Sequence, residues 1–258
     1  MNSGFYSAYS GFAARVDQLE IVANNLANVN TAGFKAQREF YRSFTASLGP
    51  QPPPPAMMTV SEAVGQAANH FGVLGGARLD LSQGTLEMTA NDTDAALEGP
   101  GFFAVLTKGG IRYTRNGSFR LDKLRNLVTQ QGDQVLSEQP IGRPPQPIQI
   151  PSGTLTISQD GSVSVDGALV AKLRVEDFPP NTQVKQEGDT YLTAPEGAGK
   201  PTVNTTVRQG ALETSNSDAI RSTVALIDLQ RTSQLMEKAL SIFHNEFNKT
   251  AAQELPRI

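Results

Sequence analysis

Apolar side chains near the N-terminus recur at alternating steps of four and three residues. They are Phe5, Tyr9, Phe12, Val16, Leu19, Ala23 and Leu26, and polar or charged residues fill most of the positions between them. This period of 3.5 residues is typical of a helix that packs along a coiled-coil seam. The pattern predicts an amphipathic helix over residues 4–27. Such a helix is only marginally stable alone in water, so we expect it to need a partner.

The C-terminal part of the chain repeats this period. Neither Pro nor Gly interrupts residues 218–255, and Ser215 and Ser217 are candidate N-caps for a long helix. The apolar residues follow one 3.5-residue repeat, which is interrupted at Ser222 and Ser233. They are Ala219, Leu226, Leu229, Met236, Leu240, Phe243 and Phe247. Two terminal helices of matching period suggest that the chain ends come together. For heptads of this general kind, however, separate packing of each helix on the central region is the favoured interpretation.

The region between these helices alternates short strand-like runs with turns that contain glycine. The turn pairs are Gly109-Gly110, Asn116-Gly117, Gly132-Asp133, Asp160-Gly161 and Asp166-Gly167, each placed where a hairpin needs a positive φ. Turns about every ten residues are typical of an antiparallel sandwich or barrel-like module. We expect strands at residues 101–106, 112–114, 118–121, 126–129, 134–136, 154–158, 162–165 and 169–175.

A proline-rich stretch precedes the strands. Pro50 and residues 52–55 cannot lie inside a helix and predict an extended spacer. A short helix is expected at residues 60–71. Gly72, Gly75 and Gly76 then predict a flexible connector, because no GK[ST] follows to make a phosphate-binding loop.

Composition and charge narrow the possible functions. The 258 residues hold 22 Lys+Arg against 25 Asp+Glu, for a net charge of −3, so no nucleic-acid partner is expected. No apolar run reaches the ~18 residues of a membrane span, and no basic segment precedes an apolar core as in a cleaved secretory signal. The chain has no cysteine, which excludes disulfides, cysteine-bound metals and thiol nucleophiles.

The remaining polar residues predict no catalytic centre. His70 and His244 are far apart and belong to no metal or triad motif. Asp92 and Asp94 flank Thr93, but the glycine and the terminal glutamate of a calcium loop are missing, so we interpret them as part of a turn. No enzyme activity, metal, cofactor or small-molecule substrate is therefore expected.

A longer motif gives the first specific indication. Residues 23–35 read A-N-N-L-A-N-V-N-T-A-G-F-K, which resembles the N-terminal signature A-N-N-L-A-N-x-x-T-x-G-[FY]-K of the rod and hook proteins of the bacterial flagellum. The matching residues are Asn24, Asn25, Leu26, Ala27, Asn28, Thr31, Gly33, Phe34 and Lys35. Asparagine side chains compete with helical backbone bonds, so they should end the first helix; Gly33 permits a turn and Phe34 anchors it.

The resemblance continues through the chain. Residues 82–86 (SQGTL), 99–105 (GPGFFAV), 113–122 (YTRNGSFRLD), 127–129 (LVT), 160–163 (DGSV) and 209–216 (QGALETSN) are similar to the blocks of that family. Gln230-Arg231 resembles the start of its Q-R-A-Y-E motif. Two departures are Ala90 where the family commonly has glycine, and Thr232-Ser233 after Gln230-Arg231.

This resemblance implies an α+β fold with long N- and C-terminal helices that pair as a coiled coil and a central antiparallel β-rich domain. Residues 1–35 with 216–258 would polymerise, 36–77 would be a joint, and 78–215 an outer β domain. The implied function is a structural subunit of the flagellar rod, which spans the periplasm. Its implied partners are copies of itself, other rod and hook proteins and the type III export apparatus. The length and single β module are closer to the rod proteins than to the longer hook protein.

Two alternatives come from other classes of protein. A secreted β-sandwich binding module would need an aromatic platform, yet aromatic residues are only 7% and tryptophan is absent. An enzyme acting on peptidoglycan would need an acid and base pair such as Glu87 with Asp122, which no motif supports.

Overall fold

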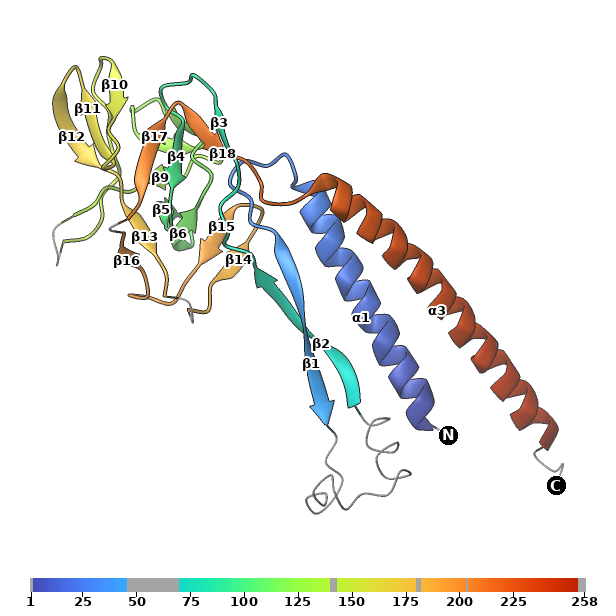
Figure 1. Ribbon diagram of the computed structural model, residues 1–258. Coiled ribbons are helices and arrows are strands. Elements are labelled where there is room, and N and C mark those ends of the chain that lie inside the picture. Colours follow the sequence, from blue (N-terminus) through green and yellow to red (C-terminus); the bar gives the residue numbers. More distant parts are fainter. Residues whose placement is uncertain (1, 46–69, 140–142, 180–181, 203, 255–258) are drawn as a thin grey trace, which may run out of the picture. The chain divides into compact units, whose positions relative to one another are not determined.

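The protein has an α+β fold with one helix at each end of the chain and a β-rich middle (Figure 1). The computed structural model describes residues 2–45, 70–139, 143–179, 182–202 and 204–254. Contacts divide the chain into two compact units. The first, which we call the helical unit, comprises Met1–Asn24, Gln37–Arg78 and Ile220–Ile258. The second, which we call the β body, comprises Asn25–Ala36 and Leu79–Ala219.

Both predicted helices are present. Helix α1 spans Asn2–Ala27 and helix α3 spans Ala219–Glu254, and the two run antiparallel within the helical unit (Figure 1). They lie close together at Gly11, where a Cβ atom would stand 3.5 Å from Cε of Met236. Because α3 begins at Ala219, its N-cap position falls on Asp218 rather than on Ser215 or Ser217.

Two long strands replace part of the predicted joint. Strand β1 (Gln37–Thr45) pairs with β2 (His70–Leu79) in a two-stranded sheet. Gly72, Gly75 and Gly76 lie in β2, so the prediction of a flexible connector is wrong. Gly76 has φ +126°, and a Cβ there would come within 3.4 Å of the Phe40 ring. That distance is an ordinary contact, so it is the positive φ that favours glycine at this position. The proline spacer and residues 60–69 of the predicted helix lie outside the described residues.

The β body is built from short antiparallel strands. Its largest sheet has the order β14-β15-β6-β5-β9-β8-β7, and β13 pairs with both β5 and β16. Within the described part of the chain this order does not close into a barrel. The strands are β3 Leu86–Met88, β4 Ala95–Glu98, β5 Phe102–Thr107, β6 Gly110–Thr114, β7 Phe119–Leu121, β8 Leu127–Thr129, β9 Gln134–Val135, β10 Leu155–Ile157, β11 Ser162–Val165, β12 Ala168–Lys172, β13 Val175–Asp177, β14 Lys185–Glu187, β15 Tyr191–Thr193, β16 Lys200–Pro201, β17 Thr206–Gln209 and β18 Ala211–Glu213.

Seven of the predicted strands match β5 to β11 closely. The eighth, at residues 169–175, is divided into β12, which pairs with β11, and β13, which pairs with β5. The division arises because the two halves join different sheets. Strands β3, β4 and β14 to β18 were not predicted.

The predicted turns show two uses of glycine. Gly110, Gly132, Gly161 and Gly167 have positive φ, as expected. Asn116-Gly117 does not close a hairpin, because β6 pairs with β5 and β15 whereas β7 pairs with β8. Gly117 is instead required by close packing, since a Cβ there would lie 1.6 Å from the carbonyl oxygen of Ala95.

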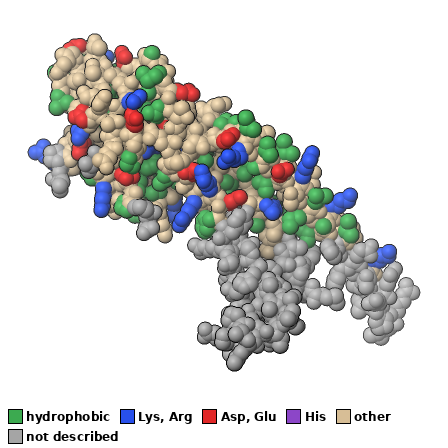
Figure 2. Space-filling model, in the orientation of Figure 1, with side chains coloured by type: hydrophobic (Ala, Val, Ile, Leu, Met, Phe, Trp, Pro, Cys, Tyr) green, Lys and Arg blue, Asp and Glu red, His purple; other side chains and the backbone are tan. Residues whose placement is uncertain are grey.

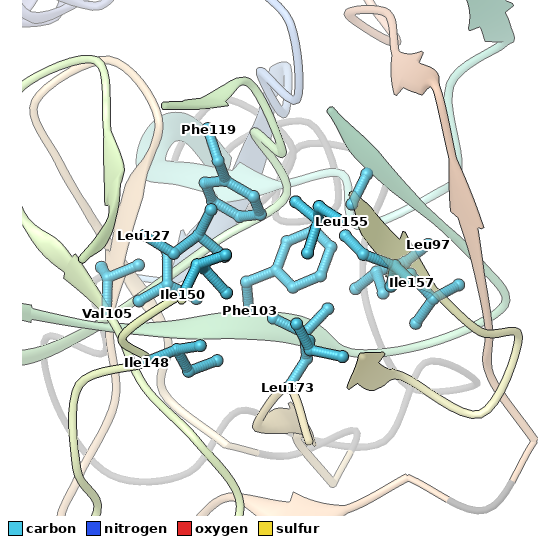
Figure 3. Close-up of a cluster of buried hydrophobic side chains, with 14 of the residues drawn as sticks. Leu97, Phe103, Val105, Phe119, Leu127, Ile148, Ile150, Leu155, Ile157 and Leu173 are labelled. Carbon is cyan, nitrogen blue, oxygen red and sulfur yellow. The ribbon is translucent and has the colours of Figure 1, made fainter. Parts of the chain in front are cut away.

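A continuous apolar core holds these strands together. Figure 3 shows Phe103 and Phe119 among aliphatic side chains from several strands, and their rings meet edge to face at 5.1 Å between centroids. A second cluster contains Phe102, Tyr113 and Phe178. These two clusters form the interior of the β body, which also holds the polar site at Lys35, Arg115 and Glu213.

Candidate functional site

The segment after α1 leaves the helix through a series of turns. The backbone N–H of Thr31 donates to the carbonyl of Asn28 (3.1 Å), and the Thr31 hydroxyl donates to the side-chain oxygen of Asn28 (3.1 Å). The N–H of Phe34 then donates to the carbonyl of Thr31 (3.2 Å). Asn28 thus uses its side chain on the turn, and the helix ends at Ala27.

Gly33 and Phe34 fix this segment to the β body. Gly33 has φ +69°, and a Cβ there would lie 2.2 Å from the backbone nitrogen of Asn116. Only glycine meets both the conformation and the lack of space. The Gly33 N–H donates to the carbonyl of Glu213 (2.7 Å), and the Phe34 side chain is fully buried.

Three charged side chains meet beside these two residues. Nζ of Lys35 lies 2.5 Å from Oε1 of Glu213, and Nη1 of Arg115 lies 3.1 Å from Oε2 of the same carboxylate. Each residue is at most 3% exposed. The charges come from widely separated parts of the sequence: Lys35 precedes β1, Arg115 follows β6, and Glu213 ends β18.

Backbone groups also bind these charges, and only Nε of Arg115 is left without a hydrogen-bond partner among the three charged groups. Lys35 also donates to the carbonyl of Ser82 (2.6 Å), and the N–H of Gly84 donates to Oε1 of Glu213 (2.9 Å). Arg115 donates through Nη2 to the carbonyl of Gly99 (2.6 Å). The cluster therefore ties together the segments at residues 35, 82–84, 99, 115 and 213.

Asn216 extends the same arrangement toward α3. Its side-chain oxygen accepts a hydrogen bond from the N–H of Ala36 (2.7 Å), and its amide nitrogen donates to the carbonyl of Asp80 (2.8 Å). We call residues 33–36, 82–84, 115 and 213–216 the hub. Because α1 ends at Ala27 and α3 begins at Ala219, the segments that lead into both helices are fastened in this one place.

Burial sets the electrostatics of the hub. It lowers the pKa of Lys35 below its usual value and outweighs the opposing effect of Glu213. Burial likewise lowers the pKa of Arg115, whose guanidinium lies 5.1 Å from the centre of the Phe102 ring. Two buried cations share one carboxylate, so removal of Glu213 would leave both without their counter-charge.

The residues of the N-terminal signature divide between the two sides of this segment. Asn25, Asn28, Gly33, Phe34 and Lys35 are buried, Leu26 and Thr31 are half-buried, and Asn24 and Ala27 are exposed. Asn28, Thr31, Gly33, Phe34 and Lys35 form the turns after α1 and the contacts with the β body.

The predicted assembly residues of the helices are only partly covered. Tyr9 is 59% exposed and Val16 is 39% exposed. The half-buried members are Phe12, Leu19, Leu26, Leu226, Leu229, Met236 and Leu240. The side chains of Phe5, Phe243 and Phe247 lie outside the described part of the structure.

Two of the acidic residues considered for catalysis or metal binding, Asp122 and Asp94, have structural contacts. Asp122 accepts hydrogen bonds from the backbone of Leu124 and Asn126 and from the Asn126 amide, and these bonds lower its pKa. A general acid in a glycosidase requires a raised pKa instead. Asp94 accepts from the side chains of Thr89 and Asn91 within the predicted turn.

The described residues contain no group of three or more His, Asp or Glu side chains that could hold a metal ion. None of the helices in the described part of the chain has the length and hydropathy of a membrane span.

Sequence reasoning did not single out Arg115 or Glu213 as site residues. Both lie in blocks that resemble the family, Y-T-R-N-G and L-E-T-S-N, so the sequence alone could have marked them as candidate site residues. Only the fold shows that these blocks meet Lys35.

Comparisons with known proteins show which family the chain resembles. Residues 96–165 match the family described as "Flagellar hook protein FlgE/F/G D1 domain", and residues 5–35 match "Flagella basal body rod protein". The chain is 30% identical to the flagellar basal-body rod protein FlgG of Borreliella burgdorferi, over 95% of this chain and 96% of the relative. It is 31% identical to the flagellar basal-body rod protein FlgF of Caulobacter vibrioides over the full length of both.

Proposed function

Because this chain belongs to the family of flagellar basal-body rod proteins, we propose that it is a structural subunit of the rod in the flagellar basal body. It polymerises with copies of itself and with other rod and hook proteins into the hollow drive shaft that transmits torque from the motor to the hook. It catalyses no reaction. The type III export apparatus of the flagellum delivers it.

The observation that carries this proposal is the hub. A shaft subunit needs its β body to hold firmly the chain segments that lead into its terminal helices. Lys35 and Arg115 form buried ion pairs with Glu213, and Glu213 also accepts the N–H of Gly84, whereas Nε of Arg115 has no hydrogen-bond partner. These bonds hold residues 35 and 213 in place inside the β body, close in sequence to the segments that lead into the two helices.

Within this function the two helices form the polymerisation domain. The assembly residues are the apolar stripes of α1, from Phe5 to Leu26, and of α3, from Leu226 to Phe247. They pack in a coiled-coil-like manner along the inner tube. The β body lies outside the tube and contacts neighbouring subunits, while the segment at residues 36–77 orients it.

The position along the rod is a finer proposal. We favour the proximal rod component FlgF, because Thr232-Ser233 departs from the family motif after Gln230-Arg231 and because the last residues, Leu255-Pro256-Arg257, are atypical. The distal component FlgG is the alternative. Basal bodies from a strain without this chain distinguish the two, since loss of a proximal subunit also removes the distal rod, whereas loss of a distal subunit leaves the proximal rod.

The experiment that tests the function introduces a charge into either stripe. Phe12→Asp or Leu240→Asp is expected to abolish incorporation into basal bodies and motility, because a carboxylate would have to be buried at a helix contact. The β body should still fold, as judged by near-UV circular dichroism.

Ala239→Asp is the matched control, since it adds the same charge at an exposed position next to Leu240. Normal motility with Phe12→Asp and with Leu240→Asp would refute the proposed function.

A further inference from the structure

The last strands of the β body pair with its first strands. Residues 205–216, which we call the clasp, contain β17 and β18 and precede α3. Strand β17 pairs with β4, and β18 pairs with β3; Figure 1 shows the clasp, in orange, beside these two strands. The contacts join residues that are far apart in the sequence. Arg208 and Glu98, which form a salt bridge, are 110 residues apart.

Strand β4 depends on the clasp for its place in the core. Among the described strands β4 pairs only with β17, and β3 pairs only with β18. Residues 95–97 of β4 are fully buried, and Val207 of the clasp belongs to the same apolar cluster. Without β17, buried N–H and C=O groups of β4 would lose their ladder partners, which is unfavourable. In the closed body, the face seen in Figure 2 shows hydrophobic side chains scattered among polar ones.

The segment after α1 depends on the clasp in the same way. The Gly33 N–H donates to the carbonyl of Glu213 (2.7 Å), and Nζ of Lys35 donates to Oε1 of the Glu213 side chain (2.5 Å). These two residues of the hub are 178 positions apart in the sequence. The Ala36 N–H donates to the side-chain oxygen of Asn216 (2.7 Å). Without the clasp, the Lys35 ammonium would have to be buried without its carboxylate.

The other sheets of the β body are complete without the clasp. Strands β5 to β9 and β13 to β16 pair among themselves, and β10 to β12 form a sheet of their own. All of these strands lie within residues 102–201. The clasp contacts them through side chains, as where Gln209 binds the backbone of Leu155 and Ile157. The clasp therefore joins the beginning of the body to sheets whose strands all precede it.

We propose that the clasp closes the β body: β3, β4 and residues 33–36 take their native positions only when residues 205–216 join them. Joining segments this distant costs loop entropy, which is offset only when the clasp contacts form. A chain that emerges with its N-terminus first therefore keeps residues 33–36 and 82–98 unfastened. They are fastened when only residues 217–258 have still to emerge.

Late closure suits a subunit that passes through an export channel, and this consequence rests on the proposed function. A folded domain is much wider than an extended chain, so a body that closed early would obstruct passage. A body that closes last stays open until most of the chain has passed. Its closure on the far side, when only α3 follows, then prevents the chain from sliding back.

Single-cysteine reporters test the order of closure, because the natural chain has no cysteine. Ala96→Cys reports on β4, Ala211→Cys on the clasp and Ala104→Cys on the large sheet, and all three positions are fully buried. Each full-length chain is refolded from urea and exposed, at successive times, to a pulse of a thiol reagent. The thiols at positions 96 and 211 should become protected together, and the thiol at position 104 no later.

Two results of this experiment would overturn the inference. One is protection of Ala96→Cys while Ala211→Cys still reacts, and the other is protection of Ala104→Cys after Ala211→Cys. Where an added sulfur atom prevents folding, Leu97→Cys and Val207→Cys replace the first pair, since they remove volume and are also buried.

Ribosome-bound chains test the same order during synthesis. Chains that carry Ala96→Cys are arrested with residues 1–204 or residues 1–218 outside the exit tunnel. The thiol should react at least several-fold faster in the shorter chain, which lacks the clasp. Ala104→Cys at the same two lengths is the matched control, and its reactivity should change less.

Equal reactivity of Ala96→Cys at the two lengths would overturn the inference. It would leave the proposed function untouched, because that function is tested separately by the motility of Phe12→Asp and Leu240→Asp. Normal motility of those two variants would in turn refute the proposed function and the consequence for export, but not the order in which the body closes.

Discussion

At the scale of single residues, Glu213 is the most constrained side chain of the hub. It is 1% exposed and accepts bonds from Lys35, Arg115 and the N–H of Gly84. Breaking a buried ion pair by removing one partner leaves an uncompensated charge, whereas removing a surplus charge does not. The hub holds two cations for one carboxylate, so its members should differ in their contribution to stability.

Glu213→Gln is predicted to destabilise the β body by about 3–5 kcal/mol, because it leaves Lys35 and Arg115 buried without an anion. Lys35→Met should cost less, about 1–3 kcal/mol, since it leaves the carbonyl of Ser82 without its donor but keeps one cation on one carboxylate. Urea unfolding of the full chains, followed by near-UV circular dichroism, measures both. An equal loss in the two variants would contradict this account of the hub.

At the scale of elements, β5 organises the large sheet because it pairs with β6, β9 and β13. This arrangement brings Tyr113 of β6 next to Glu176 of β13, to which the Tyr113 hydroxyl donates a hydrogen bond (2.9 Å). The Tyr113 ring also meets Phe178 edge to face, with 4.8 Å between centroids. Burial, reinforced by the charge of Glu176, raises the pKa of Tyr113.

A pH dependence follows from this raised pKa. In the unfolded chain tyrosine loses its proton near pH 10, while folded Tyr113 keeps it to higher pH. Above about pH 10 the unfolded state therefore binds fewer protons, and the free energy of unfolding falls as pH rises. Tyr113→Phe should show a smaller loss of stability between pH 8 and pH 10.5 than the natural chain, measured by urea unfolding.

The comparison of the two proteins isolates the effect of Tyr113 on the pH dependence of stability, because Tyr191 and Lys35 contribute to that dependence in both proteins. At pH 8 the variant should be slightly less stable, since it lacks the bond to Glu176. The same pH-dependent loss in both proteins would be inconsistent with the raised pKa.

At the scale of the whole molecule, the two compact units differ in how much apolar surface they leave uncovered. The β body has its own apolar clusters. Helix α3, in contrast, has exposed large apolar side chains along its length, namely Ile220, Val224, Ile227, Leu235 and Ile242. Helices in proteins gain most of their stability from tertiary packing. The terminal helices of a subunit in dilute solution should therefore open more readily than the body does.

Limited proteolysis of a verified monomer checks this difference. We expect rapid cleavage in α3 and in the segment at residues 37–78, and a resistant core close to residues 79–219. The peptide that contains residues 25–36 should stay bound to that core, because Phe34 and Lys35 are buried in it. Mass spectrometry of the fragments identifies which segments are cleaved. Protection of α3 in the monomer would contradict this expectation, because it would mean that the exposed apolar side chains of α3 are already covered.

The sequence alone determined a large part of this protein. The 3.5-residue periods specified both helices, glycine turns specified strands β5 to β11, and the motif at residues 23–35 indicated the family that the comparisons confirm. These features are local, because a helix or a hairpin is encoded by residues that are neighbours along the chain. Strands β3, β4 and β16 to β18 were missed because their partners are distant, as where β17 pairs with β4.

Tertiary structure alone decided the hub and the faces of the helices. Lys35 and Glu213 are ordinary charged residues in sequence, and only folding removes water from around them and so makes their pairing necessary. In the same way, the periodicity gave α3 one apolar face, whereas the exposed fractions show a second one. Periodicity records which side chains share a face, but which face meets a neighbour depends on contacts between residues that lie far apart along the chain.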